Sequence, residues 1–169
     1  MSEIIKKHVI AVLIDNEFGA LARVVELFSA RGYNIETLCV APISSDKKIS
    51  RITITTFGTD KTVDLICKLL QRIIPVHTSA ELTRSEGYIE RELALAQIIG
   101  DSEIVKKASQ ALNNFRFSIV DTEADSTVFE IIGNSNEIEQ ALKILESHGL
   151  ATVSRTGIAA GFKGKKRLY

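Results

Sequence analysis

Two hydrophobic spacings alternate along the first half of the chain, one typical of strands and one typical of helices. A continuous apolar run over 9–14 predicts a buried strand, and apolar residues within 21–28 then recur at the i, i+3, i+4, i+7 spacing of one helix face. The later elements are predicted in the same way, as strands over 33–41, 49–57 and 76–82 and a helix over 61–73. With right-handed crossovers, this order folds into a four-stranded antiparallel sheet with both helices on one face.

The same order of elements is predicted a second time after a polar break over 83–87. The strands are expected over 89–99, 117–122, 128–132 and 150–158, and the helices over 104–115 and 138–145. The pattern repeats although the residues do not. We therefore predict an α+β protein with two ferredoxin-like βαββαβ domains, 1–83 and 84–169, each an antiparallel sheet with helices on one face.

Each predicted half covers only one face of its sheet with helices, so a semi-apolar sheet face is left over. Pairing with a second copy of the chain buries such a face. We expect an isologous two-fold dimer that places two copies of the loop over 16–21 near a shared seam.

Composition narrows the class of protein. The 169 residues are 45% hydrophobic, and 21 basic residues balance 21 acidic ones, so no net charge attracts nucleic acid or an anionic membrane. The longest apolar run, 9–14, is too short to span a bilayer, and residues 1–8 lack the layout of a signal peptide. We expect a cytoplasmic protein with neither nucleic acid nor membrane as a partner.

Cysteine and histidine do not form a recognisable metal-binding or catalytic motif. Cys39 and Cys67 are 28 residues apart without a Cys-x-x-Cys pair, and His8, His77 and His148 are solitary in the sequence. We therefore predict no metal site and assign these side chains no chemistry.

The polar loop between the first strand and the first helix is the candidate site. It lies at a helix N-terminus, where unpaired N–H groups and the positive dipole end favour an anion such as a carboxylate, and Asn16 can add its amide. In the alternative interpretation, Asp15 or Asn16 merely caps the helix and Asn34 adopts an unusual turn conformation after Gly32. Spacing alone favours this alternative.

Six short segments of the chain match the motifs of a known family. In the first half they are NEFGALARV (16–24), FSARGYNIE (28–36), VAP (40–42) and SRIT (50–53), and in the second half EREL (90–93) and RTG (155–157). With these segments the chain resembles, over nearly its whole length, the small, regulatory subunits of acetolactate synthase, also called acetohydroxyacid synthase, whose N-terminal half is an ACT domain. Phe18 departs from the pattern, since family members often carry proline or a small residue there.

The resemblance implies a non-catalytic chain without catalytic residues or a cofactor of its own. Such a subunit stimulates a separate catalytic large subunit and makes it sensitive to feedback inhibition by valine, in the biosynthesis of branched-chain amino acids. Thiamine diphosphate, magnesium and FAD are expected only on that partner. The resemblance also implies a homodimer through the ACT domains, followed in each chain by an ACT-like second domain.

Carried onto this sequence, the resemblance places the valine contacts on two copies of the chain. One copy supplies Asn16, Gly19, Ala20 and Leu21, and its mate supplies Asn34 and Ile35. Helix N–H groups over 19–21 can receive the effector carboxylate, and the side-chain oxygens of Asn16 and Asn34 can accept from its ammonium group. Leu21 and Ile35 can line the pocket for its side chain.

Other functions on this fold fit the residues less well. RNA-binding domains carry aromatic residues on the third strand, but 49–57 has only the terminal Phe57, and metal carriers need a cysteine pair in the first loop. A small self-contained transferase could use Asp15, Asn16 and Arg23, yet no nucleophile lies beside a base. A stand-alone amino-acid-binding module that regulates a different enzyme remains an alternative.

Overall fold

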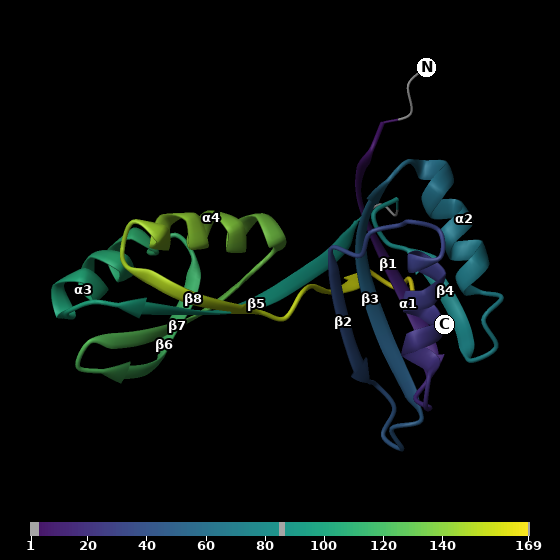
Figure 1. Cartoon of the computed structure of the whole chain (residues 1–169), viewed down its shortest axis with the longest axis horizontal. Helices are drawn as coiled ribbons and strands as arrows, with labels where there is room; N and C mark the ends of the chain where they lie inside the picture. Colours follow the sequence, from purple (N-terminus) through teal and green to yellow (C-terminus); the bar gives the residue numbers. More distant parts are fainter. Residues whose placement is uncertain (1–3, 85–86, 169) are drawn as a thin grey trace. The chain divides into compact units, whose positions relative to one another are not determined.

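Strand β1 (Lys6–Asp15) is a central strand of the first sheet, with a neighbour on each side. The computed structural model describes residues 4–84 and 87–168, and the first elements follow in the predicted order (Figure 1). They are α1 (Ala20–Ser29), β2 (Thr37–Pro42), β3 (Ile49–Gly58), α2 (Asp60–Leu70) and β4 (Val76–Glu81). The strand order is β2-β3-β1-β4 with every neighbouring pair antiparallel, which confirms the predicted fold.

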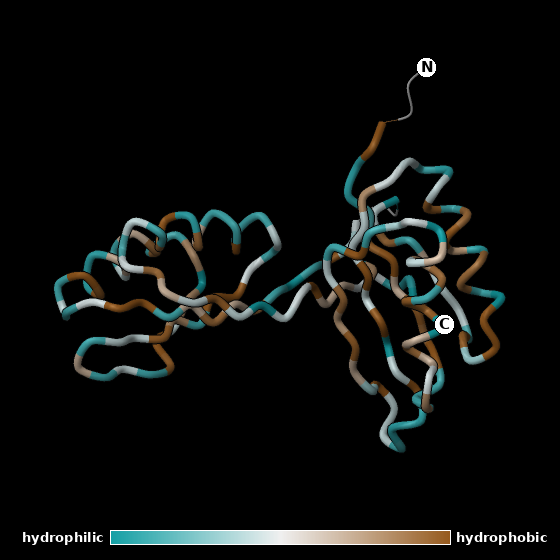
Figure 2. The backbone as a smooth tube through the Cα atoms, viewed as in Figure 1, coloured by the Kyte–Doolittle hydropathy of each residue, from teal (hydrophilic) through white to brown (hydrophobic). Residues whose placement is uncertain are grey.

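Both helices of this first unit pack on its sheet, α2 through the face that the periodicity identified. Helix α1 buries Ala20, Val24, Leu27 and Phe28, so the predicted face is wrong at Leu21 and Val25, which are 39% and 37% exposed. Figure 2 shows apolar and polar residues alternating along α2. The shared core includes Ile10, Val12 and Ile14 from β1, Val24 and Phe28 from α1, Ile52 and Ile54 from β3, and Val63, Ile66 and Leu70 from α2. Because each such side chain contributes roughly 1.5–3 kcal/mol when buried, tertiary packing rather than helix propensity holds the two helices in place.

The second unit repeats this arrangement. Its elements are β5 (Tyr88–Ile99), α3 (Ser102–Ala111), β6 (Arg116–Glu123), β7 (Ser126–Gly133), α4 (Ser135–Glu146) and β8 (Leu150–Arg155). The strand order is β6-β7-β5-β8, again antiparallel, and β9 (Ala159–Phe162) pairs with β5 outside this order. Alternate residues of β5, from Ala94 to Ile98, form the core with Phe129 of β7 and the inner faces of α3 and α4.

The helix-free face of the first sheet is also buried, which the periodicity did not predict. Val9 and Ala11 of β1 point away from the helices, yet both are fully buried. Strand β9 contacts β1, and the Arg51 guanidinium of β3 donates to the Ala160 carbonyl oxygen. The C-terminal segment therefore covers this face.

Tertiary contacts divide the chain differently from the expected ranges 1–83 and 84–169. The first unit comprises residues up to 89 together with 159–169, and the second comprises 90–158. The strand expected over 150–158 ends at Arg155, because Gly157 has a left-handed φ of 72° and breaks the strand. The chain then continues as β9, which belongs to the first unit.

Candidate functional site

The loop between β1 and α1 carries most of the predicted site, and Asn16 holds it against the β2–β3 hairpin. The Asn16 backbone N–H donates to the Lys48 carbonyl oxygen at 2.7 Å. The side-chain nitrogen Nδ2 of Asn16 donates to the Lys47 carbonyl oxygen at 2.8 Å. This bond uses one of the two N–H donors of the amide and fixes its orientation, so the oxygen Oδ1 and the second N–H of Asn16 remain for a ligand.

The N-terminus of α1 has no side-chain cap. Gly19 is the N-cap residue, with a left-handed φ of 78°, and no side chain accepts from the first turn. The other three helices of the described chain are capped, by Thr59, Asp101 and Asn134. The alternative that Asp15 or Asn16 caps α1 is therefore wrong. The Asp15 carboxylate instead pairs with the ring nitrogen Nε2 of His77 at 2.6 Å.

Side chains on the first turn of α1 differ in what they can offer. Ala20 is buried in the core and its backbone N–H donates to the Glu17 carbonyl oxygen at 3.3 Å, whereas Leu21 is 39% exposed. Phe18 is fully exposed and packs on nothing in the unit. An ideal Cβ on Gly19 would meet no heavy atom within 4 Å, so the space beside this glycine is open toward a ligand.

The other two predicted residues lie at the opposite end of α1. Asn34 and Ile35 follow Gly32, beyond the C-terminus of a ten-residue helix that is about 15 Å long. Gly32, with a φ of 68°, takes the left-handed conformation that the alternative interpretation gave to Asn34. The Asn34 side chain donates to Glu36 Oε1 at 2.5 Å, and Ile35 packs against the core. One chain therefore does not bring the six predicted residues together.

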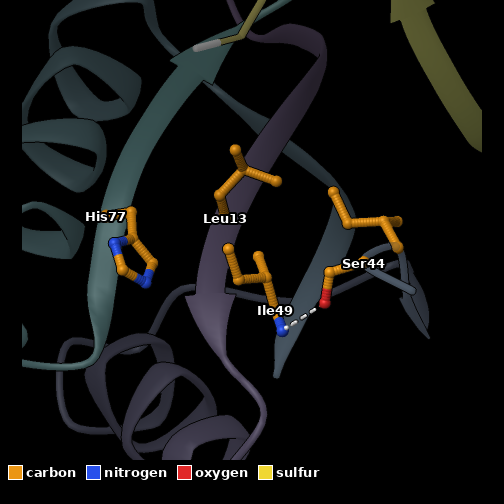
Figure 3. A pocket seen from close by; sticks show the side chains of 5 residues that line it. Leu13, Ser44, Ile49 and His77 are labelled. Carbon is orange, nitrogen blue, oxygen red and sulfur yellow. Dashed lines mark hydrogen bonds between the residues drawn. The ribbon is translucent and has the colours of Figure 1, made fainter. Parts of the chain in front are cut away.

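A separate apolar pocket opens near the same loop. It has a volume of about 360 Å³, and its lining is Leu13, Ile43, Ser44, Ile49 and His77 (Figure 3). The Ser44 hydroxyl accepts a hydrogen bond from the Ile49 backbone N–H at 3.0 Å. None of the six predicted site residues lines this pocket. Sequence reasoning missed it because three strands and a hairpin loop each contribute a side chain.

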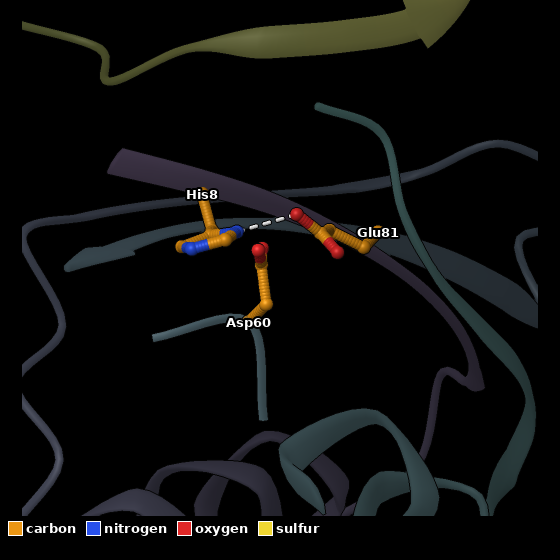
Figure 4. Close-up of side chains that lie close together, drawn as sticks. All are labelled: His8, Asp60 and Glu81. Carbon is orange, nitrogen blue, oxygen red and sulfur yellow. Dashed lines mark hydrogen bonds and ion pairs between the residues drawn. The ribbon is translucent and has the colours of Figure 1, made fainter. Parts of the chain in front are cut away.

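A buried histidine anchors an ion-pair network on the first unit (Figure 4). The His8 ring nitrogen Nδ1 contacts Glu81 Oε1, and Nε2 lies 3.1 Å from the Gly58 carbonyl oxygen. A ring nitrogen of His8 and one carboxylate oxygen each of Glu81 and Asp60 lie within 4.8 Å of one another.

Basic side chains balance the two carboxylates of this network. Arg84 Nε pairs with Glu81 Oε2 at 2.5 Å, and Lys6 Nζ pairs with Asp60 at 3.0 Å. The hydrogen bond from Lys6 lowers the pKa of the Asp60 carboxyl below its ordinary value, with Coulombic help from Lys6 and Arg84. The cluster thus has the charge balance of a structural network that ties β1 to α2 and β4.

The two motifs quoted from the second half of the sequence meet in the structure. Arg155 donates from Nε and Nη2 to the two carboxylate oxygens of Glu92, at 2.7 and 2.8 Å. The Glu92 side chain is fully buried, and its hydrogen bond raises the pKa of the Arg155 guanidinium. The neighbouring Leu93 and Thr156 exchange further hydrogen bonds, so these motifs fasten β5 to β8.

In the part of the chain that the structure describes, no helix has both the length and the apolar content that crossing a bilayer requires.

Comparisons with known proteins cover both units. A family described as the AHAS small subunit-like ACT domain matches residues 10–78, and one described as the small subunit of acetolactate synthase matches residues 91–161. A protein of Archaeoglobus fulgidus named a probable acetolactate synthase small subunit is 37% identical over 161 residues, covering 95% of this chain and 99% of the relative.

Two further relatives agree. The acetolactate synthase small subunit of Aquifex aeolicus is 34% identical, over 92% of this chain and 81% of the relative. The crystal structure of the acetolactate synthase small subunit from Thermotoga maritima is 28% identical with a TM-score of 0.85, and the match covers 95% of this chain and 99% of that chain. Because the matches extend over both units and agree in fold, the chain belongs to the family of acetolactate synthase small subunits.

Proposed function

We propose that this chain is the non-catalytic regulatory subunit of an acetolactate synthase. It stimulates a catalytic, thiamine-diphosphate-dependent large subunit and makes that partner sensitive to inhibition by valine. The observation that carries the proposal is the uncapped N-terminus of α1 in a chain of this family. Three capped helices in the same fold provide the internal comparison.

The first turn of α1 supplies what the carboxylate of an amino acid needs. Its N–H groups over 19–21 have no side-chain acceptor, although that of Ala20 donates to the Glu17 carbonyl oxygen at 3.3 Å, and the positive end of the helix dipole favours a negative charge there. The free oxygen of Asn16 can accept from the ammonium group, because the nitrogen of the same amide is fixed on Lys47. Leu21, partly exposed, offers apolar contact to the side chain of the effector.

A second copy of the chain completes this site in the proposal. Asn34 and Ile35 lie about one helix length from Asn16 within a chain, so they can reach an effector on this loop only from a dimer mate. We propose that the mate supplies the oxygen of Asn34 to the ammonium group and Ile35 to the apolar side chain. Valine binding and dimer formation are then coupled.

Calorimetry on the purified chain tests the effector site. Asn16→Ala removes a hydrogen bond to a charged group, so we expect about a 10- to 100-fold weaker valine affinity. Gly19→Asp should weaken it further, because it adds bulk and a negative charge where the carboxylate docks. Asn136→Ala, on an exposed asparagine of α4, is the matched control and should leave affinity unchanged. Equal affinities in Asn16→Ala and the control would contradict the site.

Activity assays test the regulatory role separately. Acetolactate formation by the catalytic subunit should rise when this chain is added and fall when valine is then titrated in. If valine alters how the two subunits interact, thermodynamic linkage requires the catalytic subunit to change the valine affinity by the same factor. Acetolactate formation from pyruvate by this chain alone would favour the self-contained transferase instead.

A further inference from the structure

The second unit contains a polar pocket that the proposed valine site does not use. It has a volume of about 250 Å³ and lies where β5 begins, α3 leads into β6, and β7 leads into α4. The polar side chains in its lining are Arg91, Asn114, Arg116 and Glu137, and the apolar ones include Phe115 and Ile131.

In the second unit, this pocket lies at the position that corresponds to Ile35 in the first unit. Gly58 and Gly133 each end a strand just before the N-cap of the following helix, which aligns the two repeats. Arg116 lies opposite Ile132, one residue before Gly133. Counting two residues outward from the paired Thr37 and Thr55 aligns Ile35 with Arg116 in the repeat, and Ile35 precedes β2 and lies outside the β2–β3 ladder. An arginine therefore stands where the first unit has an aliphatic side chain.

Both arginines keep donors for a ligand. Arg91 uses Nη1 on the Glu90 carbonyl oxygen at 2.7 Å, which leaves the other guanidinium N–H groups. No described residue forms an ion pair or a side-chain hydrogen bond with the Arg116 guanidinium. Arg155, in contrast, is committed to a buried carboxylate. Guanidinium groups bind planar carboxylates in a bidentate manner, so this pair favours a carboxylate ligand.

The nearby helix N-terminus is not the anion-binding element. Asn134 caps Glu137 N–H at 2.9 Å, Glu137 Oε2 accepts from Asn134 N–H at 2.7 Å, and Glu90 Oε1 accepts from Ser135 N–H at 3.1 Å. The N–H groups of Asn134, Ser135 and Glu137 are thus satisfied within the chain. The second carboxylate oxygen of Glu137 adds a negative group to the pocket, which suits an ammonium group on the same ligand.

We propose that this pocket binds a dicarboxylic amino acid, such as glutamate or aspartate. Arg91 and Arg116 bind its two carboxylates, while Glu137 and the side-chain oxygen of Asn114 accept from its ammonium group. The two guanidinium groups and one carboxylate of the pocket match, with opposite sign, the two carboxylates and one ammonium of the ligand. This site extends beyond the proposed valine regulation and does not depend on it.

Calorimetry on the full chain with L-glutamate, L-aspartate, glutarate and valine tests the proposal. Arg116→Ile, which installs the aliphatic residue type of the first unit, should weaken the better dicarboxylic amino acid by about 10- to 100-fold and leave valine affinity unchanged. Arg72→Ile, on an exposed arginine of the first unit, is the control and should change neither. Thermal unfolding should be unchanged in both, since both side chains are exposed.

A second variant tests the ammonium contact. Glu137→Gln keeps an acceptor for the Asn134 N–H but removes the charge, so it should weaken glutamate about tenfold. Glutarate has no ammonium group and should bind no more weakly, because a like charge beside its carboxylates is removed. Glutarate binding as tightly as glutamate, or Arg116→Ile binding like Arg72→Ile, would overturn the proposal. If the unsubstituted chain bound glutamate but not valine, only the proposed function would be contradicted.

Discussion

Removing the guanidinium of Arg155 is expected to destabilise the second unit, because Glu92 would then be buried without a counter-charge. The Glu92 side chain is fully buried, and Arg155 is about one-third exposed at its other end. The bidentate contact satisfies both carboxylate oxygens at 2.7 and 2.8 Å. Arg155→Met keeps an apolar side chain of comparable reach and deletes both hydrogen bonds.

The magnitude follows from the burial of the pair. Breaking a buried ion pair by removing one partner costs about 3–5 kcal/mol, since the remaining charge stays desolvated. Solvent reaches one side of Arg155, so we expect a loss near the lower end, about 3 kcal/mol. Glu92→Gln should cost less, about 1–2 kcal/mol, because the arginine it leaves behind can turn toward water.

Urea unfolding at pH 7 measures these losses, with Arg23→Met as the matched control. Arg23 pairs with Glu17 at 3.5 Å on the exposed surface, so its loss should cost about 0–1 kcal/mol. The double variant Arg155→Met with Glu92→Gln should lose less than the sum of the single losses, because each single variant leaves an unpaired charge whereas the double variant leaves none. An Arg155→Met loss no larger than that of Arg23→Met would refute the reasoning.

Three further outcomes are expected. Gly19→Ala places a Cβ on a residue with a left-handed φ and should lower the free energy of unfolding by about 1–2 kcal/mol. Gly161 has open space around it and no left-handed φ, so Gly161→Ala should change the free energy of unfolding by less than about 0.5 kcal/mol. Equal losses in the two variants would contradict the conformational argument. Burial, with help from neighbouring carboxylates, raises the pKa of the Cys67 thiol from 9.0 to about 11. Iodoacetamide at pH 8, followed by mass spectrometry, should therefore label Cys67 about 100-fold more slowly in the native chain than in the urea-unfolded chain. Equal labelling rates would contradict the raised pKa. Lys6 lowers the pKa of the Asp60 carboxyl, so the contribution of this pair to stability is present above about pH 3.8 and is lost as the pH falls through the folded-state pKa of Asp60. In NMR titrations, Lys6→Met should raise the pKa of Asp60 toward 3.8. An unchanged pKa would contradict the contact.

Periodicity predicted the helices and the central strands because each of them carries a buried face whose spacing is local. The strand over 9–14 and the helix over 21–28 appear as β1 and α1 with small changes at their ends. Strand β2 begins only at Thr37, later than the expected 33, because the chain after Gly32 is held by turn and side-chain hydrogen bonds instead of the ladder. Ends of elements depend on such contacts and are poorly visible in a local pattern.

The sequence identified the loop of the candidate site but misassigned some of its local roles. Asparagine is a common helix-capping residue, yet the Asn16 side-chain amide donates to the Lys47 carbonyl oxygen, in a hairpin that lies far along the chain. Aspartate is also a common capping residue, yet the Asp15 carboxylate pairs with His77, which the fold brings close from β4. Capping preferences are local statistics, and a stronger partner supplied by tertiary structure overrides them.

The sequence by itself determined the α+β class, the repeated order of elements, the core face of α2 and the family resemblance, since all of these depend on neighbouring residues. Which residues of α1 face the core was decided by the tertiary structure. Only the tertiary structure decided that β9 covers the helix-free face of the first sheet, that Glu92 meets Arg155, and that Asn34 lies a helix length away from Asn16. Contacts between distant segments depend on how the sheets close and on which partners compete for each donor. A pattern of neighbouring residues does not encode these choices.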